Sequence, residues 1–130
     1  MTTGSPQEIA AASDVVLLAV KPGDMAALCS DLAKVEGSRL YLSIAAGLKL
    51  ADLESWLGSQ QRVIRSMPNT PALVGTGAAA FSRGSSATAD DAALARKILG
   101  AVGTADEVSE KLLDAVTGLS GSGPAYVYTV

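Results

Sequence analysis

The chain of 130 residues contains no histidine and a single cysteine. Without histidine it cannot build a Ser-His-Asp triad, a histidine-ligated zinc site or an imidazole acid-base catalyst. The one thiol, Cys29, cannot form an internal disulfide, and it falls on a predicted helix as a small apolar side chain. A lone thiol of this kind fits a reducing compartment, so a cytoplasmic location is expected.

The sequence also has little positive charge and no long apolar run. Its 10 Lys and Arg residues are scattered singly against 13 Asp and Glu residues, so no basic surface for nucleic acid is expected. No apolar run approaches the roughly 18 residues of a membrane span, and residues 1–12 lack the segments of a signal peptide. With 48% apolar and 18% charged residues, the composition indicates a globular domain with neither nucleic acid nor membrane as partner.

Apolar runs alternate with helical patterns along the first half of the chain. Six consecutive apolar residues at 15–20 predict a strand buried on both faces, as in a parallel sheet. Ser5, Pro6 and Glu8 form a capping box that predicts a short helix before this strand. The alternation predicts an α/β fold. Strands are expected at residues 15–20, 40–44 and 62–66, and helices at 5–12, 25–37 and 50–57.

The second half continues the alternation with weaker strands. A short strand is predicted at 78–82 and an edge strand at 104–108. Helical turns are predicted at 71–74 and a helix at 111–119, and Thr88 caps another helix between the two strands. The apolar face of that capped helix is expected to consist of Ala92, Ala95, Ile98 and Leu99.

Acidic residues offer no candidate site. Each is assigned to a solvent face or a helix cap, so neither a catalytic carboxylate pair nor a metal site is expected. The residues concerned are Asp52, Glu54, Asp90, Asp91, Asp106, Glu107 and Glu110.

Three loops follow predicted strands, and a parallel sheet would bring them to one edge, where open α/β sheets hold their ligands. Lys21-Pro22 places a cation where a phosphate or ribose could lie, although a lone lysine is more often simply solvated. Ala45-Ala46-Gly47 would let a flat ring lie against the backbone, or would serve equally for close packing of helix on strand. Pro68 and Pro71 stiffen the loop that presents Asn69; alone, such a loop is more often a rigid connector.

Glycine clusters near the end of the chain do not form a dinucleotide fingerprint. Gly118, Gly121 and Gly123 follow a helical pattern and lack the G-x-G-x-x-G spacing, and Gly75 and Gly77 make a two-glycine turn. The segment 121–123 precedes a predicted helix start and would suit either an anion or a flexible join between domains.

Four motifs, taken in order and spacing, closely resemble the pyrroline-5-carboxylate reductases over residues 5–130. Each motif is weak or moderate alone, and the four in register make the resemblance specific. They are Ala19-Val20-Lys21-Pro22, Ser43-Ile44-Ala45-Ala46-Gly47, Arg65-Ser66-Met67-Pro68-Asn69-Thr70-Pro71 and the stretch from Asp114 to Tyr126 that contains Gly121-Ser122-Gly123-Pro124.

The resemblance implies a partial Rossmann-type doubly wound sheet over residues 1–119 and the beginning of an all-helical dimerisation domain at 120–130. It implies reduction of 1-pyrroline-5-carboxylate, a cyclic imine, to L-proline in proline biosynthesis, with NADPH or NADH as hydride donor. It also implies a homo-oligomer. Since a protonated imine accepts hydride readily, such an enzyme chiefly has to position its reactants, and it needs neither histidine nor a metal.

The resemblance also assigns roles by position. Cofactor contacts fall on Ala19, Val20, Lys21, Pro22, Ile44, Ala45 and Ala46. Met67, Pro68 and Asn69 would border the reacting centre as positioning residues, and residues 120–124 would lie close to the active cleft.

Two features depart from the family pattern. The Gly-rich phosphate loop that members carry near their start and the substrate loop of their later helices are not found, so an internal fragment that is inert alone is expected. Lys49 stands where members often have a helix-capping Ser or Thr, which weakens that helix start. Alternatives left open are another NADP-dependent reductase, acting on 2-keto or 3-hydroxy acids, and a non-catalytic module that binds a nucleotide or a partner.

Overall fold

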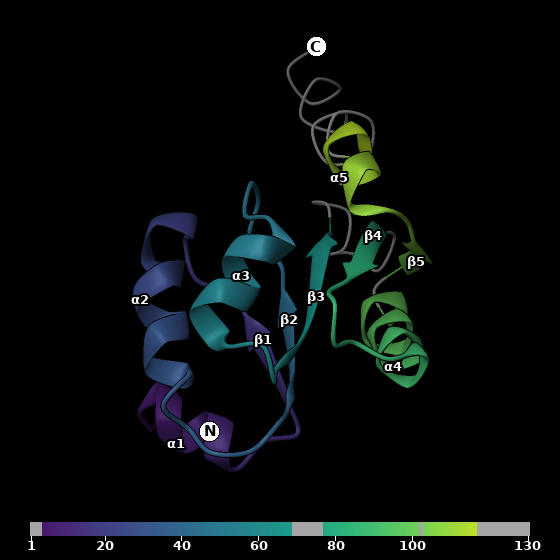
Figure 1. The fold of residues 1–130 in the computed structure, drawn as a ribbon. Helices are drawn as coiled ribbons and strands as arrows, with labels where there is room; N and C mark the ends of the chain where they lie inside the picture. Colours follow the sequence, from purple (N-terminus) through teal and green to yellow (C-terminus); the bar gives the residue numbers. More distant parts are fainter. Residues whose placement is uncertain (1–3, 69–76, 102, 117–130) are drawn as a thin grey trace.

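The computed structural model describes residues 4–68, 77–101 and 103–116. One sheet, in the strand order β1-β2-β3-β4-β5, carries helices on both faces (Figure 1). The strands are β1 (Val15–Leu18), β2 (Leu40–Ser43), β3 (Arg62–Met67), β4 (Gly77–Arg83) and β5 (Gly103–Glu107). The helices are α1 (Pro6–Ala11), α2 (Pro22–Leu32), α3 (Leu50–Leu57), α4 (Ala89–Gly100) and α5 (Glu110–Val116).

The sheet is mixed. β1, β2 and β3 are parallel, as predicted, with Leu18 opposite Ser43 and Ser43 opposite Arg65. β4 runs antiparallel to β3, and β5 runs parallel to β4. The expected α/β fold is therefore confirmed. The predicted parallel sheet is not parallel throughout, because β4 runs in the opposite direction to β3.

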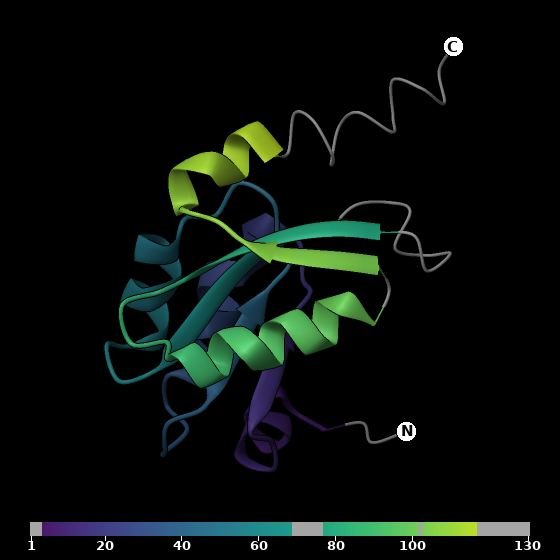
Figure 2. The ribbon, with the colours of Figure 1, turned by 90° about the vertical axis from the view of Figure 1, so that its right-hand side faces the viewer.

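Two hydrophobic layers lie on opposite faces of the sheet because neighbouring residues of a strand point to opposite sides. Tyr41 of β2 packs with α1, α2 and α3 in one layer. Leu40 and Leu42 of the same strand pack in the other layer, beneath α4. Figure 2 shows α4 running alongside β4 and β5. With helices on both faces, the fold is of the doubly wound type.

Both predicted helix caps are present, and each is a complete capping box. Glu8 N donates to Ser5 Oγ at 3.2 Å, and Ser5 N donates back to the Glu8 carboxylate. At α4, Asp91 N donates to Thr88 Oγ1 at 3.2 Å and Thr88 N donates to Asp91 Oδ2 at 2.9 Å. Because each box satisfies N–H groups that have no partner within the helix, it fixes where the helix begins.

The prediction for residues 15–20 was wrong in two respects. The strand ends at Leu18, and Leu17 is 54% exposed rather than buried. Within the described part of the sheet, β1 is an edge strand, and α4 covers the face around β3 to β5, beyond the reach of Leu17. Six apolar residues in a row therefore identify the strand without showing that both of its faces are covered.

Two smaller predictions were also wrong. α2 ends at Leu32 rather than near residue 37, because its last turn tightens into three-residue hydrogen bonds. Ile98 is 38% exposed, since the buried line of α4 consists of Ala92, Ala95 and Leu99. Asp91 belongs to the cap of α4, as predicted, and it is also buried. The predicted turn at 71–74 and residues 120–130 lie outside the described residues.

Candidate functional site

The carboxyl ends of β1, β2 and β3 lie at the same edge of the sheet, because these three strands are parallel and in register. The loops predicted to converge therefore do so, as far as the structure describes them. Ile44 N donates to the carbonyl of Leu18 at 3.2 Å, so the loop after β2 is joined directly to the end of β1.

The loop after β1 leads straight into α2. Ala19 and Val20 are exposed, and Lys21 occupies the N-cap position with extended backbone and no side-chain cap bond. Pro22 is the first residue of the helix, where its missing N–H has no consequence. Lys21 is therefore an exposed cation beside the N-terminus of an 11-residue helix.

The loop after β2 is held from below by two buried serines. Ala45 N donates to Ser43 Oγ at 3.3 Å, and Ser66 Oγ of β3 donates to the Ser43 carbonyl at 2.8 Å. Ile44 is half-buried, Ala45 is buried and Ala46 is exposed. The start of the loop is therefore held in place, and the loop exposes the methyl group of Ala46 and its backbone to solvent.

Gly47 continues this exposed backbone. Its φ of 78° lies in the left-handed region, which favours glycine, and a Cβ placed there would have no atom within 4 Å. The site after β2 is thus open on its outer side, with room for a flat group against the backbone.

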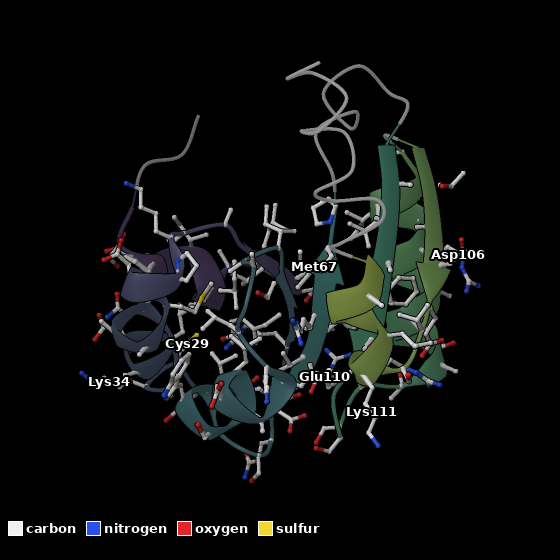
Figure 3. The ribbon with its side chains drawn as sticks, turned by 90° about the horizontal axis from the view of Figure 1, so that it is seen from above. Cys29, Lys34, Met67, Asp106, Glu110 and Lys111 are labelled. Carbon is white, nitrogen blue, oxygen red and sulfur yellow. The ribbon has the colours of Figure 1, made fainter. Side chains whose placement is uncertain are left out.

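Met67 and Pro68, at the end of β3, form the third wall of the candidate site, after the loops that follow β1 and β2. Met67 is buried against Ala80 of β4 and Leu113 of α5, and Pro68 is half-buried. In Figure 3 Met67 lies at the end of β3, beside α5. Asn69 lies outside the described residues, so its predicted position between the two prolines stays a prediction.

A polar group between α3 and α5 was not predicted from the sequence. Glu110, the first residue of α5, accepts a hydrogen bond from Leu50 N at 2.8 Å. Its carboxylate lies 3.8 Å from Nη1 of Arg65, whose side chain is 3% exposed. Lys49 at the N-cap was the available signal, since a lysine side chain cannot accept from the helix N–H groups and so leaves them open to an acceptor from elsewhere in the chain.

A cavity of about 260 Å³ lies beside this group, lined by Lys49, Arg65, Glu110 and Lys111. Among these four lining residues Glu110 carries the single negative charge.

Titratable groups elsewhere add little to the chemistry of this edge. Cys29 is a buried residue of α2, and burial raises the pKa of its thiol to about 11. Over residues 4–68, 77–101 and 103–116, no three acidic, thiol or imidazole groups come together as a metal site. In the same ranges, no helix is long and apolar enough to span a bilayer.

Comparison with known proteins gives a consistent match. Residues 1–47 fit the family model described as "NADP oxidoreductase coenzyme F420-dependent". The chain is 47% identical over 123 residues to a pyrroline-5-carboxylate reductase of Arabidopsis thaliana, covering 94% of this chain and 44% of that protein. The chain thus spans about half the length of the curated relatives it matches.

Solved structures agree. The pyrroline-5-carboxylate reductase of Coxiella burnetii superposes with a TM-score of 0.92 at 38% identity, covering 98% of this chain and 48% of that one. The Plasmodium falciparum enzyme, solved with NADP bound, gives a TM-score of 0.93 at 34% identity, covering 98% of this chain and 48% of that one. Identity and superposition at this level, across nearly all of its residues, show that the chain belongs to the pyrroline-5-carboxylate reductase family.

Proposed function

We propose that this chain forms the nicotinamide-facing part of a reductase that converts 1-pyrroline-5-carboxylate to L-proline with NADPH or NADH. One observation carries the proposal. Three strand ends that meet at one edge of the sheet bear the loops at 19–22, 44–47 and 67–68, in a chain that belongs to this family.

The residues at this edge fit a nicotinamide dinucleotide. Ala46 and Gly47 leave open backbone on which a flat ring can rest, and Ala45 beneath them is too small to block it. Lys21 offers an exposed positive charge beside the N-terminus of α2, where phosphate or ribose oxygens are favoured. Ala19, Val20, Pro22 and Ile44 would complete the wall that faces the cofactor.

The residues of this chain would act by position rather than by proton transfer. The reduced nicotinamide, when bound, supplies the hydride that the imine carbon accepts. Ala45 and Ala46 would hold the ring flat, and Met67 with Pro68 would exclude water from one side of the reacting centre. Asn69 would orient the substrate from the same loop. None of these roles requires a side chain with a shifted pKa.

The remaining assignments also stay proposals. Residues 1–119 would form the nucleotide-binding domain, and residues 120–130 would begin a helical domain through which subunits pair as a homo-oligomer. The reaction is expected in the cytoplasm.

A titration of the 130-residue chain with NADPH, followed by amide NMR shifts, tests the proposal. We expect the amides of Lys21, Ala46 and Met67 to shift with saturation, and those of Gly37 and Ser59, at the opposite end of the sheet, to stay unchanged. Shifts at neither set, or equal shifts at both, would contradict the proposal. A parallel assay of NADPH oxidation with 1-pyrroline-5-carboxylate measures whether these residues turn over substrate by themselves.

A further inference from the structure

The start of α3 depends on a residue from far along the chain. Its N-cap residue, Lys49, makes no side-chain cap bond, whereas α1 and α4 have complete local capping boxes. Instead Glu110 accepts from Leu50 N at 2.8 Å, across 60 residues of sequence. A carboxylate at this place accepts a hydrogen bond from one free N–H group, and it is also stabilised by the positive end of the helix dipole.

The same carboxylate faces a buried positive charge. Arg65 projects from β3, and its Nη1 lies 3.8 Å from Glu110 Oε2. The Glu110 side chain is 31% exposed, so it is partly shielded from water, and its attraction to Arg65 is stronger than at an open surface. One side chain of α5 thus contacts a helix start and a strand at once. Figure 3 shows Glu110 at the beginning of α5, on the side towards α3.

These contacts hold the loop between β2 and α3, which belongs to the surface proposed to receive the nicotinamide. The loop between β2 and α3 is fixed at its beginning by the bond from Ala45 N to Ser43 Oγ, and at its end by the bond from Leu50 N to Glu110. Ala46 and Gly47, which are exposed, lie between these two anchors. A change in the position of α5 would therefore change the position of the loop.

α5 is also attached to the third wall of the site. Its buried residue Leu113 packs against Met67 and Ala80. A shift of α5 would therefore act on Met67 through packing and on the loop at 45–49 through Glu110. This makes the first turn of α5 the common support of two of the three walls.

We propose that Glu110 is a positioning residue, which sets the loop at 45–49 relative to α5 and thereby fixes the surface that receives the nicotinamide. The inference rests on the function proposed above. A purely structural role, as a cap for α3 and nothing more, is the competing explanation.

Substitutions separate the two roles. Glu110→Ala removes both the cap and the link to α5, and Glu110→Gln keeps an acceptor for Leu50 N while it removes the charge. Adding Lys49→Ser to Glu110→Ala supplies a local cap for α3 without restoring the link. Asp106→Ala is the matched control, since it removes an exposed acidic residue of β5 that lies away from this group (Figure 3).

Three measurements on the 130-residue chain provide the test: urea unfolding, the amide shifts of Ala46 and Gly47, and the NADPH concentration at half-saturation of those shifts. We expect Glu110→Ala to lower stability, to move both amides and to weaken NADPH binding about fivefold. Lys49→Ser with Glu110→Ala should recover stability but neither the amide shifts nor the affinity. Glu110→Gln should fall between the wild type and Glu110→Ala, and Asp106→Ala should match the wild type.

Recovery of all three quantities in the double variant would overturn the positioning role, and so would unchanged Ala46 and Gly47 amides in Glu110→Ala. If Glu110→Ala does not fold, the comparison of Glu110→Gln with the wild type decides: displaced Ala46 and Gly47 amides with weaker NADPH binding support the proposal, and wild-type values of both overturn it. Failure of the proposed function has a different signature: the wild-type amides would not respond to NADPH, while the shifts without NADPH still report on positioning.

Discussion

Arg62 and Asp91 join the sheet to α4 through an ion pair, in which Arg62 Nη1 donates to Asp91 Oδ1 at 2.6 Å. The Asp91 side chain is 5% exposed, and its other oxygen accepts the N-cap amide of Thr88. One buried carboxylate therefore closes a capping box and neutralises an arginine of β3. The two groups are 29 residues apart in sequence.

Asp91→Ala is expected to destabilise the protein by about 2–3 kcal/mol, since it removes a helix cap and leaves Arg62 without this partner. Urea unfolding measures the loss. Asp90→Ala is the control: Asp90 is exposed in the same first turn, and its removal should change stability by about 0.5 kcal/mol or less. Equal effects of the two substitutions would contradict the importance of burial.

Gly84→Ala is expected to destabilise by about 1–3 kcal/mol, because a Cβ at this position would clash with Glu54 Oε1 and lie 2.9 Å from the Val63 carbonyl. The glutamate can move away, but the carbonyl belongs to β3 and accepts a hydrogen bond from Gly84 N. Gly100→Ala is the matched control, since a Cβ there meets no atom within 4 Å and should be neutral or stabilising. Thermal unfolding of the two variants decides the matter, and a stable Gly84→Ala protein would disprove the close approach.

Cys29 should make stability depend on pH in the alkaline range. Its pKa is raised to about 11 by burial, so the folded chain keeps the thiol proton at pH values where the unfolded chain has lost it. The stability difference between the wild type and Cys29→Ala should therefore be constant below about pH 9 and fall between about pH 9 and 11. Urea unfolding of both proteins at several pH values measures it.

The same burial should protect Cys29 from alkylation. Iodoacetamide should label the folded chain far more slowly than the chain in urea, because the thiolate is the reactive form and is scarce in the folded state. Equally fast labelling of folded and unfolded chains would contradict the buried position.

Lys21→Ala is expected to weaken NADPH binding roughly fivefold, corresponding to about 1 kcal/mol for one exposed charge. Lys34→Ala is the control, since Lys34 is also exposed but follows the C-terminal end of α2 and pairs with Asp31 at 3.5 Å. The titration described for the wild type measures both variants. A Lys34 effect as large as that of Lys21 would point to general charge attraction rather than to a site at the start of α2.

The sequence by itself determined the local structure and the family. Apolar runs and capping residues such as Ser5 and Thr88 act over a few residues, so they can be identified without the fold. Four short motifs in register sufficed for the resemblance, and the parallel strands brought the described parts of the first three loops towards one edge as expected.

Only the tertiary structure decided which side chains meet across long stretches of sequence. The reversal of β4, the exposure of Leu17, and the bonds of Glu110 to α3 and of Asp91 to Arg62 all depend on which elements become neighbours. A charged residue has the same local pattern whether it faces solvent or a helix start from another part of the chain. From the sequence, Glu110 was therefore assigned to a solvent face or a local cap. Only the packing of α5 against α3 makes it the cap of that distant helix.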